Sequence, residues 1–248
     1  MTSAVDGTEP PLPHCVGMSS SSTAFLFDLD GTLVDSVYNH VRAWHLALSD
    51  EGIALSVWRI HRKIGMSGGL FTAQLLRELG REIDAATIAR LRARHAEHFL
   101  KLSGEVVPLP GAVELLATLG ELGLPWAIAT SGRMVTAEAN LRSLGLDIES
   151  ATVVTRDQVE FAKPDPDLFV EAARRLGTTT AGSYVVGDSI WDMLAAARCG
   201  ALGIGLLSGG YGRDELERAG ALRVYDDPAD MLAHLDELAP RTRNDPSD

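Results

Sequence analysis

Two aspartates, Asp28 and Asp30, follow directly on a short apolar run that begins at Ala24. A short run of this kind is typical of a buried strand, and ligands of parallel sheets bind where the strands end. If the strand stays extended, both carboxylates face the same side and repel each other unless a cation or a shared proton intervenes. The two residues are therefore either a solvated acidic pair or a metal site with a nucleophile beside an acid/base.

A second polar cluster, Thr130, Ser131 and Gly132, follows an apolar run that ends at Ala129. A hydroxyl beside free backbone N–H groups at the start of a helix can bind an anion. Because Thr and Ser are also ordinary helix caps, the cluster taken alone is equally compatible with a structural role.

Further charged side chains, Lys163, Asp188 and Asp192, occur in two later segments. Lys163 precedes Pro164, which suits the first turn of a helix, and Asp188 follows another apolar run. Asp192 is four residues beyond Asp188, a spacing that brings both carboxylates to one face of a helix start. The structural alternatives are a solvated lysine and an Asp188 that caps the helix.

Taken together, the four groups suit phosphoryl transfer better than any of them does alone. They comprise paired carboxylates, a hydroxyl with backbone donors, a lysine and a second pair of carboxylates. Carboxylates bind Mg²⁺, whereas lysine, hydroxyl and backbone N–H groups bind phosphate oxygens. If all four lie at the ends of parallel strands, the fold brings them to one edge of the sheet.

Strand and helix patterns alternate from about residue 104 onward. Such alternation predicts an α/β fold with a doubly wound, Rossmann-like parallel sheet covered by helices on both faces. After the first strand, the predicted strands lie at 125–130, 151–154, 183–188, 202–207 and 222–225.

Residues 36–103 show apolar side chains at helical spacing and no strand pattern. This predicts a small all-α cap domain of about four helices, inserted into the α/β domain after its first strand. The remaining domain boundaries follow from composition, since the chain ends are polar and the leader is rich in Pro and Ser. We expect a disordered leader at 1–22, an α/β core at 23–35 and 104–240, and a tail at 241–248.

The four clusters resemble, in order, the four motifs of the haloacid dehalogenase-like (HAD) hydrolase superfamily. The helical insert makes the chain most similar to phosphatases and mutases of the phosphoglycolate phosphatase and β-phosphoglucomutase type. The resemblance covers nearly everything from residue 24 to residue 238. The matching segments are Asp28-Leu29-Asp30-Gly31-Thr32, Thr130, Lys163 with Pro164, and Gly187-Asp188-Ser189 with Asp192.

The resemblance implies a role for each matching residue. Asp28 attacks phosphorus and becomes an aspartyl-phosphate, while Asp30 first protonates the leaving oxygen and then deprotonates the attacking water. Thr130 and Lys163 hold the phosphoryl oxygens, helped by backbone groups near Ser131 and Gly132.

The resemblance also implies Mg²⁺ as the cofactor. Its ligands are the Asp28 carboxylate, the Asp30 backbone carbonyl and Asp188. Asp192 belongs to the same acidic cluster and supports Lys163 or a metal-bound water.

Substrate choice is expected to lie with the helical insert. Arg62 stands near the position where related mutases place an arginine that grips a second phosphate, although Lys63 departs from the expected local order. We predict His40 and Arg62 as substrate-binding residues. A packed histidine and solvated charges at 62 and 63 are the structural alternatives.

These features predict a Mg²⁺-dependent phosphatase that acts on a small phosphorylated metabolite such as a sugar phosphate or phosphoglycolate. Two alternatives stay open: a sugar phosphomutase of the β-phosphoglucomutase type, and a phosphate-binding module without turnover. A phosphomutase would have to keep water from the aspartyl-phosphate, and a binding module would need no acid/base such as Asp30.

Composition excludes several other classes of protein. The net charge of −12 argues against nucleic acid or an anionic membrane as the main partner. Only two cysteines, Cys15 and Cys199, occur in the chain, so a disulfide framework is not expected. The leader lacks the apolar stretch of a signal peptide, and no apolar run is long enough to span a membrane. We expect a cytoplasmic monomer or homodimer.

Overall fold

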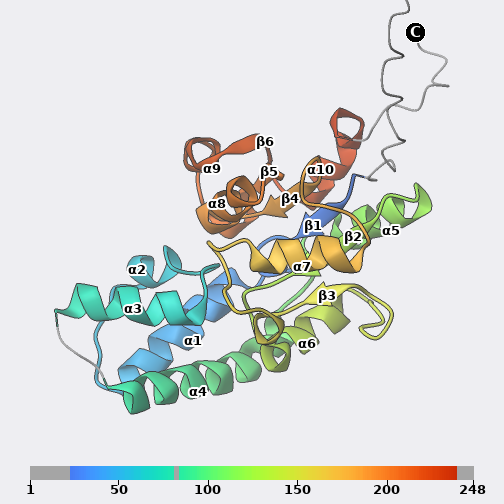
Figure 1. The fold of residues 1–248 in the computed structure, drawn as a ribbon. Helices are drawn as coiled ribbons and strands as arrows, with labels where there is room; N and C mark the ends of the chain where they lie inside the picture. The colour runs from blue at the N-terminus through green and yellow to red at the C-terminus, as the bar shows by residue number, and fades with distance from the viewer. Residues whose placement is uncertain (1–22, 81–83, 239–248) are drawn as a thin grey trace, which may run out of the picture.

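The computed structural model describes residues 23–80 and 84–238, which form an α/β fold (Figure 1). The predicted leader at 1–22 and the predicted tail at 241–248 lie outside the described residues. Among the helices of the described part, none combines the length and the apolar character needed to cross a bilayer.

Six parallel strands form the sheet, in the order β3-β2-β1-β4-β5-β6. From β1 the chain adds strands in one direction as far as β3, and from β4 in the other direction, so the order reverses between β1 and β4. A reversal of this kind leaves a crevice at the carboxyl ends of the two strands. The predicted doubly wound sheet is confirmed. The strands are β1 (Phe25–Phe27), β2 (Trp126–Ala129), β3 (Val153–Val154), β4 (Tyr184–Gly187), β5 (Leu202–Leu206) and β6 (Ala221–Tyr225).

Helices cover both faces of the sheet, and the alternation of β1 side chains shows how. Phe25 and Phe27 pack in one layer with residues of α5, α6 and α10, whereas Leu26 packs in the opposite layer with α7 and α8. Each of these fully buried side chains contributes about 1.5–3 kcal/mol. The core helices are α5 (Ala112–Glu121), α6 (Met134–Ser143), α7 (Asp167–Arg175), α8 (Ile190–Arg198), α9 (Arg213–Ala219) and α10 (Pro228–Ala233).

In the described part of the segment between β1 and α5, four α-helices form the helical insert, and they gather at one end of the sheet (Figure 1). The insert has its own apolar core, in which Trp44 stacks on Phe71 beside Leu91. Local sequence sets the starts of two of its helices, because Ser67 and Asp84 each accept a hydrogen bond from a backbone N–H in the first turn. The helices are α1 (Val37–Asp50), α2 (Val57–His61), α3 (Gly68–Leu79) and α4 (Ala85–Leu102).

The first strand does not continue through both aspartates of its motif. Asp28 still donates its backbone N–H to the Val186 carbonyl at 2.8 Å, but the chain then turns, and Leu33 N–H donates to the Leu29 carbonyl at 2.9 Å. Gly31, with φ of 83°, allows this turn. Asp30 therefore lies in a turn, and the premise that placed both carboxylates on one face of an extended strand does not hold.

Candidate active site

Three buried aspartates gather where the order of the strands reverses. Asp28 follows β1, whereas Asp188 and Asp192 lie between β4 and the first turn of α8. Carboxylate oxygens of the three residues lie within 4.8 Å of one another. The Lys163 ammonium contacts the Asp28 carboxylate and lies 2.8 Å from Asp192. Three carboxylates and one ammonium leave a net charge of about −2 when all are ionised, which suits a divalent cation.

Proton affinities in this acidic cluster reflect its excess of negative charge. Burial, together with the charges of Asp192 and Asp30, raises the pKa of Asp28 to about 7, despite the opposing charge of Lys163. Burial and the same kind of repulsion, from Asp192 and Asp28, raise the pKa of Asp188 well above its ordinary value. The pKa of Lys163 is also raised, because Asp192 and Asp28 outweigh its burial. A metal cation at this place would relieve the repulsion, so the residues fit a divalent metal site.

Glycines allow the acidic cluster to pack this closely. Gly209 ends the short 3-10 helix η3 (Leu207–Gly209), and a Cβ atom built on Gly209 would overlap the Asp188 carboxylate. On the other side, a Cβ atom on Gly31 would lie 2.7 Å from Asp188 Oδ2. Thr32 also donates its hydroxyl to Asp188 at 3.1 Å. Asp188 is thus held between two backbone segments, and any side chain at Gly209 would displace it.

Asp192 links the start of α8 to Lys163. Its Oδ2 atom accepts hydrogen bonds from the Ser189 hydroxyl at 2.6 Å and from the Ser189 backbone N–H at 3.1 Å. Its Oδ1 atom faces Lys163. The residue that caps α8 is therefore Ser189. Asp188 does not cap the helix, which was the structural alternative for this residue.

Asp30 occupies a different environment from Asp28. Its carboxylate accepts hydrogen bonds from Ser36 at 2.6 Å and from Asn140 at 2.9 Å, and it lies 3.2 Å from His40 Nε2. Burial opposes ionisation, but His40, Ser36 and Asn140 together lower the pKa of Asp30 to about 2. Two carboxyl groups with opposite pKa shifts are a pattern typical of sites that divide nucleophilic and acid/base roles.

His40 connects Asp30 to the interior of the helical insert. Its other ring nitrogen, Nδ1, lies 3.2 Å from His95 Nε2, and its ring stacks on Phe99 with the centroids 3.8 Å apart. Burial and the neighbouring His40 lower the pKa of His95 well below its ordinary value. These contacts fix the His40 ring, so its Nε2 atom stays directed at Asp30.

The loop after β2 offers donors for an anion. Thr130 Oγ1 accepts a hydrogen bond from the Gly132 backbone N–H at 2.9 Å, which folds the loop back on itself. The buried hydroxyl oxygen of Ser131 has no hydrogen-bond partner within the described part of the chain. A buried polar atom without a partner is costly, so a ligand oxygen at this place would be stabilising.

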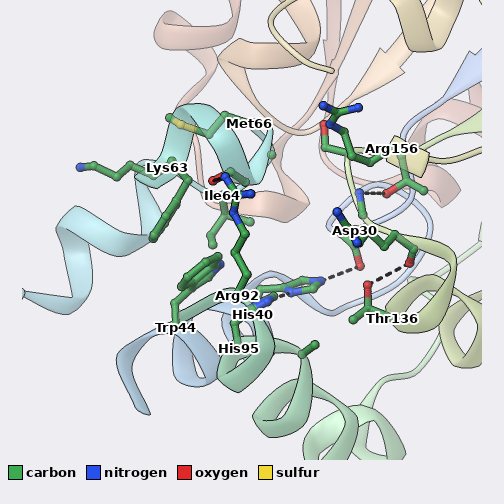
Figure 2. A pocket seen from close by; sticks show the side chains of 18 of the residues that line it. Asp30, His40, Trp44, Lys63, Ile64, Met66, Arg92, His95, Thr136 and Arg156 are labelled. Carbon is green, nitrogen blue, oxygen red and sulfur yellow. Dashed lines mark hydrogen bonds and ion pairs between the residues drawn. The ribbon is translucent and has the colours of Figure 1, made fainter. Parts of the chain in front are cut away.

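A cavity of about 220 Å³ opens between the helical insert and the strand ends. Figure 2 shows side chains from both parts of the molecule directed into it. Trp44 and Phe71 supply apolar walls, and His95 borders the base. Six of the predicted site residues line it: Asp28, Asp30, His40, Thr130, Ser131 and Gly132.

The structure gives Arg62, which was predicted to bind substrate, and its neighbour Lys63 carboxylate partners of their own. Arg62 does not line the cavity; it donates two hydrogen bonds to Glu215 and its guanidinium lies 4.0 Å above the Tyr211 ring. Lys63 borders the cavity, but its ammonium donates to Glu78 at 2.7 Å and points away from the cavity (Figure 2). The geometry gives no support to a substrate contact by Arg62.

Several residues of the site are absent from the sequence prediction. Asn140 lies in the middle of α6 and carries no local signal, since an asparagine on a helix is usually exposed. The sequence could have indicated Gly209, because the run Ser208-Gly209-Gly210 follows closely after a strand and predicts a turn there. Three arginines of the cavity wall, Arg92, Arg133 and Arg156, come from segments far apart in the chain.

Comparison with known proteins places these features in a wider context. A family model described as haloacid dehalogenase-like hydrolase matches residues 23–200. A phosphoglycolate phosphatase of Rhodospirillum rubrum is 35% identical over 216 residues, which cover 84% of this chain and 88% of the relative. Hexitol phosphatase A of Escherichia coli is 36% identical over 179 residues, covering 71% of this chain and 79% of the relative.

A solved structure shows a similar fold. The crystal structure of a hydrolase from Pseudomonas syringae is 57% identical in sequence and superimposes with a TM-score of 0.86. The match covers 88% of this chain and 100% of that chain.

Proposed function

The chain belongs to the haloacid dehalogenase-like hydrolase family, and we propose that it is a Mg²⁺-dependent phosphatase that hydrolyses a small phosphorylated metabolite of the sugar phosphate or phosphoglycolate type. Family membership confirms the resemblance drawn from the four sequence motifs. The observation that carries the proposal is the buried cluster of Asp28, Asp188, Asp192 and Lys163 beside a separately held Asp30. The α1–α4 insert would act as the cap that encloses the substrate.

In this proposal Asp28 is the nucleophile. Its carboxylate lies at the end of β1 and lines the cavity, where an incoming phosphate can reach it. Attack forms an aspartyl-phosphate and releases the alcohol, and hydrolysis of that bond then releases inorganic phosphate. Lys163 compensates the charge of Asp28 and would hold a phosphoryl oxygen together with Thr130 and Ser131.

Asp30 serves as the acid/base in the same scheme. It lines the cavity beside Asp28 but is hydrogen-bonded to His40, Ser36 and Asn140 instead of Lys163. It would give a proton to the leaving oxygen and then take one from the attacking water.

Mg²⁺ would be held by Asp28 and Asp188, with the Asp30 backbone carbonyl as a further oxygen ligand. Both oxygens of Asp192 already bind Ser189 and Lys163, so we assign Asp192 to the support of Lys163. When bound, the cation neutralises the repulsion between the carboxylates and an incoming phosphate.

The phosphomutase alternative rested on the resemblance of the helical insert and on Arg62 as a second phosphate contact. Because Arg62 is hydrogen-bonded to Glu215 outside the cavity, this observation no longer favours a mutase. Incubation with a hexose 1-phosphate and a trace of the bisphosphate provides the test: we expect free phosphate and no isomer. Formation of the 6-phosphate would support the mutase instead.

The first prediction concerns the nucleophile. Replacing Asp28 by Asn removes the attacking oxygen and should lower Mg²⁺-dependent phosphate release from p-nitrophenyl phosphate by about 1,000-fold or more. The matched control is Asp35→Asn, since Asp35 lies three residues beyond the same motif but is exposed and does not line the cavity. A wild-type rate in Asp28→Asn would overturn the assignment of the nucleophile.

A further inference from the structure

Three arginines in the cavity wall have no part in the phosphate chemistry proposed above. Arg92 belongs to α4, Arg133 directly precedes α6, and Arg156 begins the 3-10 helix η2 (Arg156–Gln158). All three line the same cavity as Asp28. Figure 2 shows Arg92 on the side of the helical insert and Arg156 on the side of the α/β core, in the segment that follows β3.

Building on the proposed phosphatase function, we propose that Arg92, Arg133 and Arg156 bind a second anionic group of the substrate. The substrate class is then a small phosphate monoester whose far end carries a carboxylate or a second phosphate. Neutral polyol and sugar monophosphates, which lack such a group, would be poorer substrates.

The charge balance of the cavity supports this assignment. Its lining includes two carboxylates, Asp28 and Asp30, and these already contact Lys163 and His40 respectively. Neither acid is within ion-pair distance of any of the three arginines. The positive charge of the arginine cluster is therefore not neutralised by the carboxylates that line the cavity.

The contacts that the arginines do make are mostly with neutral groups. Arg92 Nη2 donates to the Gly68 carbonyl at 3.4 Å and to the Thr72 hydroxyl at 3.3 Å. Arg156 Nη1 donates to the Val159 carbonyl at 2.6 Å. Among the described residues, only Arg133 has a carboxylate nearby, Asp157, at 3.5 Å between largely exposed side chains. An exposed ion pair of that length contributes little and would compete weakly with a bound anion.

The positive charges of Arg133 and Arg156 also act on the Arg92 guanidinium. Partial burial and the charges of Arg133 and Arg156 lower the pKa of Arg92. An anion placed among them would relieve this repulsion and could accept paired hydrogen bonds, as guanidinium groups commonly give to carboxylates and phosphates.

Two other cations of the described part of the insert, Arg62 and Lys63, do not supply this function in the observed arrangement. Arg62 is bonded to Glu215 and Lys63 to Glu78, so each already has a carboxylate partner. The small cavity and its apolar walls, Trp44 and Phe71, further indicate a short ligand with little polar surface between its two charged ends.

The test compares matched pairs of esters that differ in one charge. One pair is 2-phosphoglycolate and its primary amide; the other is propane-1,3-diol bisphosphate and the corresponding monophosphate. With Mg²⁺ present, the anionic member of at least one pair should have a kcat/KM about 10- to 100-fold higher than its neutral partner. The pair with the larger ratio identifies the second anion as a carboxylate or a phosphate.

Variants then assign the preference to the arginines. Arg92→Gln and Arg156→Gln should each lower the anionic-to-neutral ratio of kcat/KM by about tenfold, mainly through KM for the anionic ester. Arg94→Gln is the matched control, because Arg94 lies on the same helix but pairs with Asp50 and does not line the cavity. Ratios near one in both pairs, or an equal effect of Arg94→Gln, would overturn the proposal.

A binding measurement separates failure of this site from failure of the proposed function. Calorimetry with Mg²⁺ compares 3-phosphonopropionate with its amide, neither of which can be hydrolysed as an ester. Tighter binding of the carboxylate, weakened about tenfold in Arg92→Gln, supports the arginine site even if no ester is turned over. Equal binding of the two phosphonates refutes it, whereas hydrolysis of p-nitrophenyl phosphate reports on the phosphatase function alone.

Discussion

At the scale of single residues, two identical side chains one residue apart have opposite proton affinities. Burial and neighbouring carboxylates raise the pKa of Asp28 to about 7, while His40, Ser36 and Asn140 overcome burial and lower the pKa of Asp30 to about 2. The difference follows from the partners that each carboxylate contacts. Asp28 shares one ammonium with another acid, whereas Asp30 has three hydrogen-bond donors of its own.

His40 should therefore set the pH range in which Asp30 can act as a base. His40→Gln removes the ring that helps to lower the pKa of Asp30, so that pKa should rise and the acidic limb of kcat at saturating Mg²⁺ should move about one unit to higher pH. The measurement is a pH–rate profile with p-nitrophenyl phosphate.

His45→Gln is the control for this substitution, because His45 lies on the same helix and is exposed. If His40→Gln lowers kcat equally at every pH, His40 acts on packing and does not tune Asp30.

At the scale of elements, the segments between strands and helices shape the acidic cluster. The capping of α8 by Ser189 directs Asp192 toward Lys163, and η3 brings Gly209 against Asp188. Ser208 reinforces this contact by donating its hydroxyl to the Gly31 carbonyl at 2.6 Å. The start of α8, the helix η3 and the turn at Gly31 thus fix the positions of the carboxylates in the acidic cluster.

A methyl group at Gly209 should disturb this arrangement. Because a Cβ atom there would overlap the Asp188 carboxylate, Gly209→Ala should raise the Kd for Mg²⁺ about 10- to 100-fold. Metal titration by calorimetry provides the measurement, with circular dichroism to check that the variant folds.

Gly212→Ala is a matched control in the same segment. Its Cβ atom would lie 3.6 Å from Glu215 Oε2, an ordinary contact. Wild-type Mg²⁺ affinity in Gly209→Ala would show that Asp188 is not a metal ligand or that the loop yields easily.

At the scale of the whole molecule, two hydrogen bonds join the helical insert to the α/β core. Tyr211 donates its hydroxyl to the Arg62 carbonyl at 3.0 Å, and the Ser67 backbone N–H donates to the Lys163 carbonyl at 3.0 Å. The second contact connects the insert to the residue that pairs with Asp28. Movement of the insert would consequently shift Lys163 relative to Asp28.

The charge of the acidic cluster should also affect the stability of the whole fold. The raised pKa of Asp28, about 7, means that the metal-free folded state holds a proton that the unfolded chain releases near pH 4. The stability linked to this proton is complete below the unfolded pKa and is lost as the pH rises through about 7. Asp188, whose pKa is also raised, acts in the same direction.

Mg²⁺ should therefore stabilise the protein more at pH 8 than at pH 5.5. At saturating Mg²⁺ we expect Tm to exceed that of the chelated protein by about 5 °C at pH 8, and by less at pH 5.5. Asp188→Asn should abolish most of this increment and raise the Tm of the metal-free protein at pH 8. Equal increments at both pH values would contradict a carboxylate cluster that binds protons and metal in competition.

The sequence by itself determined the sheet, the place of the helical insert and the main acidic residues. Apolar runs and helical periodicity follow from the need to bury one face of each element, so they can be recognised locally. The resemblance to a known family then singled out Asp28, Lys163 and Asp188. Asp28 and Asp188 directly follow β1 and β4, whereas Lys163 lies between η2 and α7. The residues predicted at 130–132 likewise lie at the cavity.

Only the tertiary structure decided what each charged side chain contacts. Arg62 and Arg92 are both arginines of the helical insert, and the sequence does not show which of them faces the cavity. In the structure Arg62 pairs with Glu215, whereas Arg92 lines the cavity. Asn140 reaches Asp30 across 110 positions of the chain, and Gly209 closes on Asp188 from another loop. Such contacts depend on how distant elements pack, because a side chain's partner is set by proximity in space and not by local periodicity.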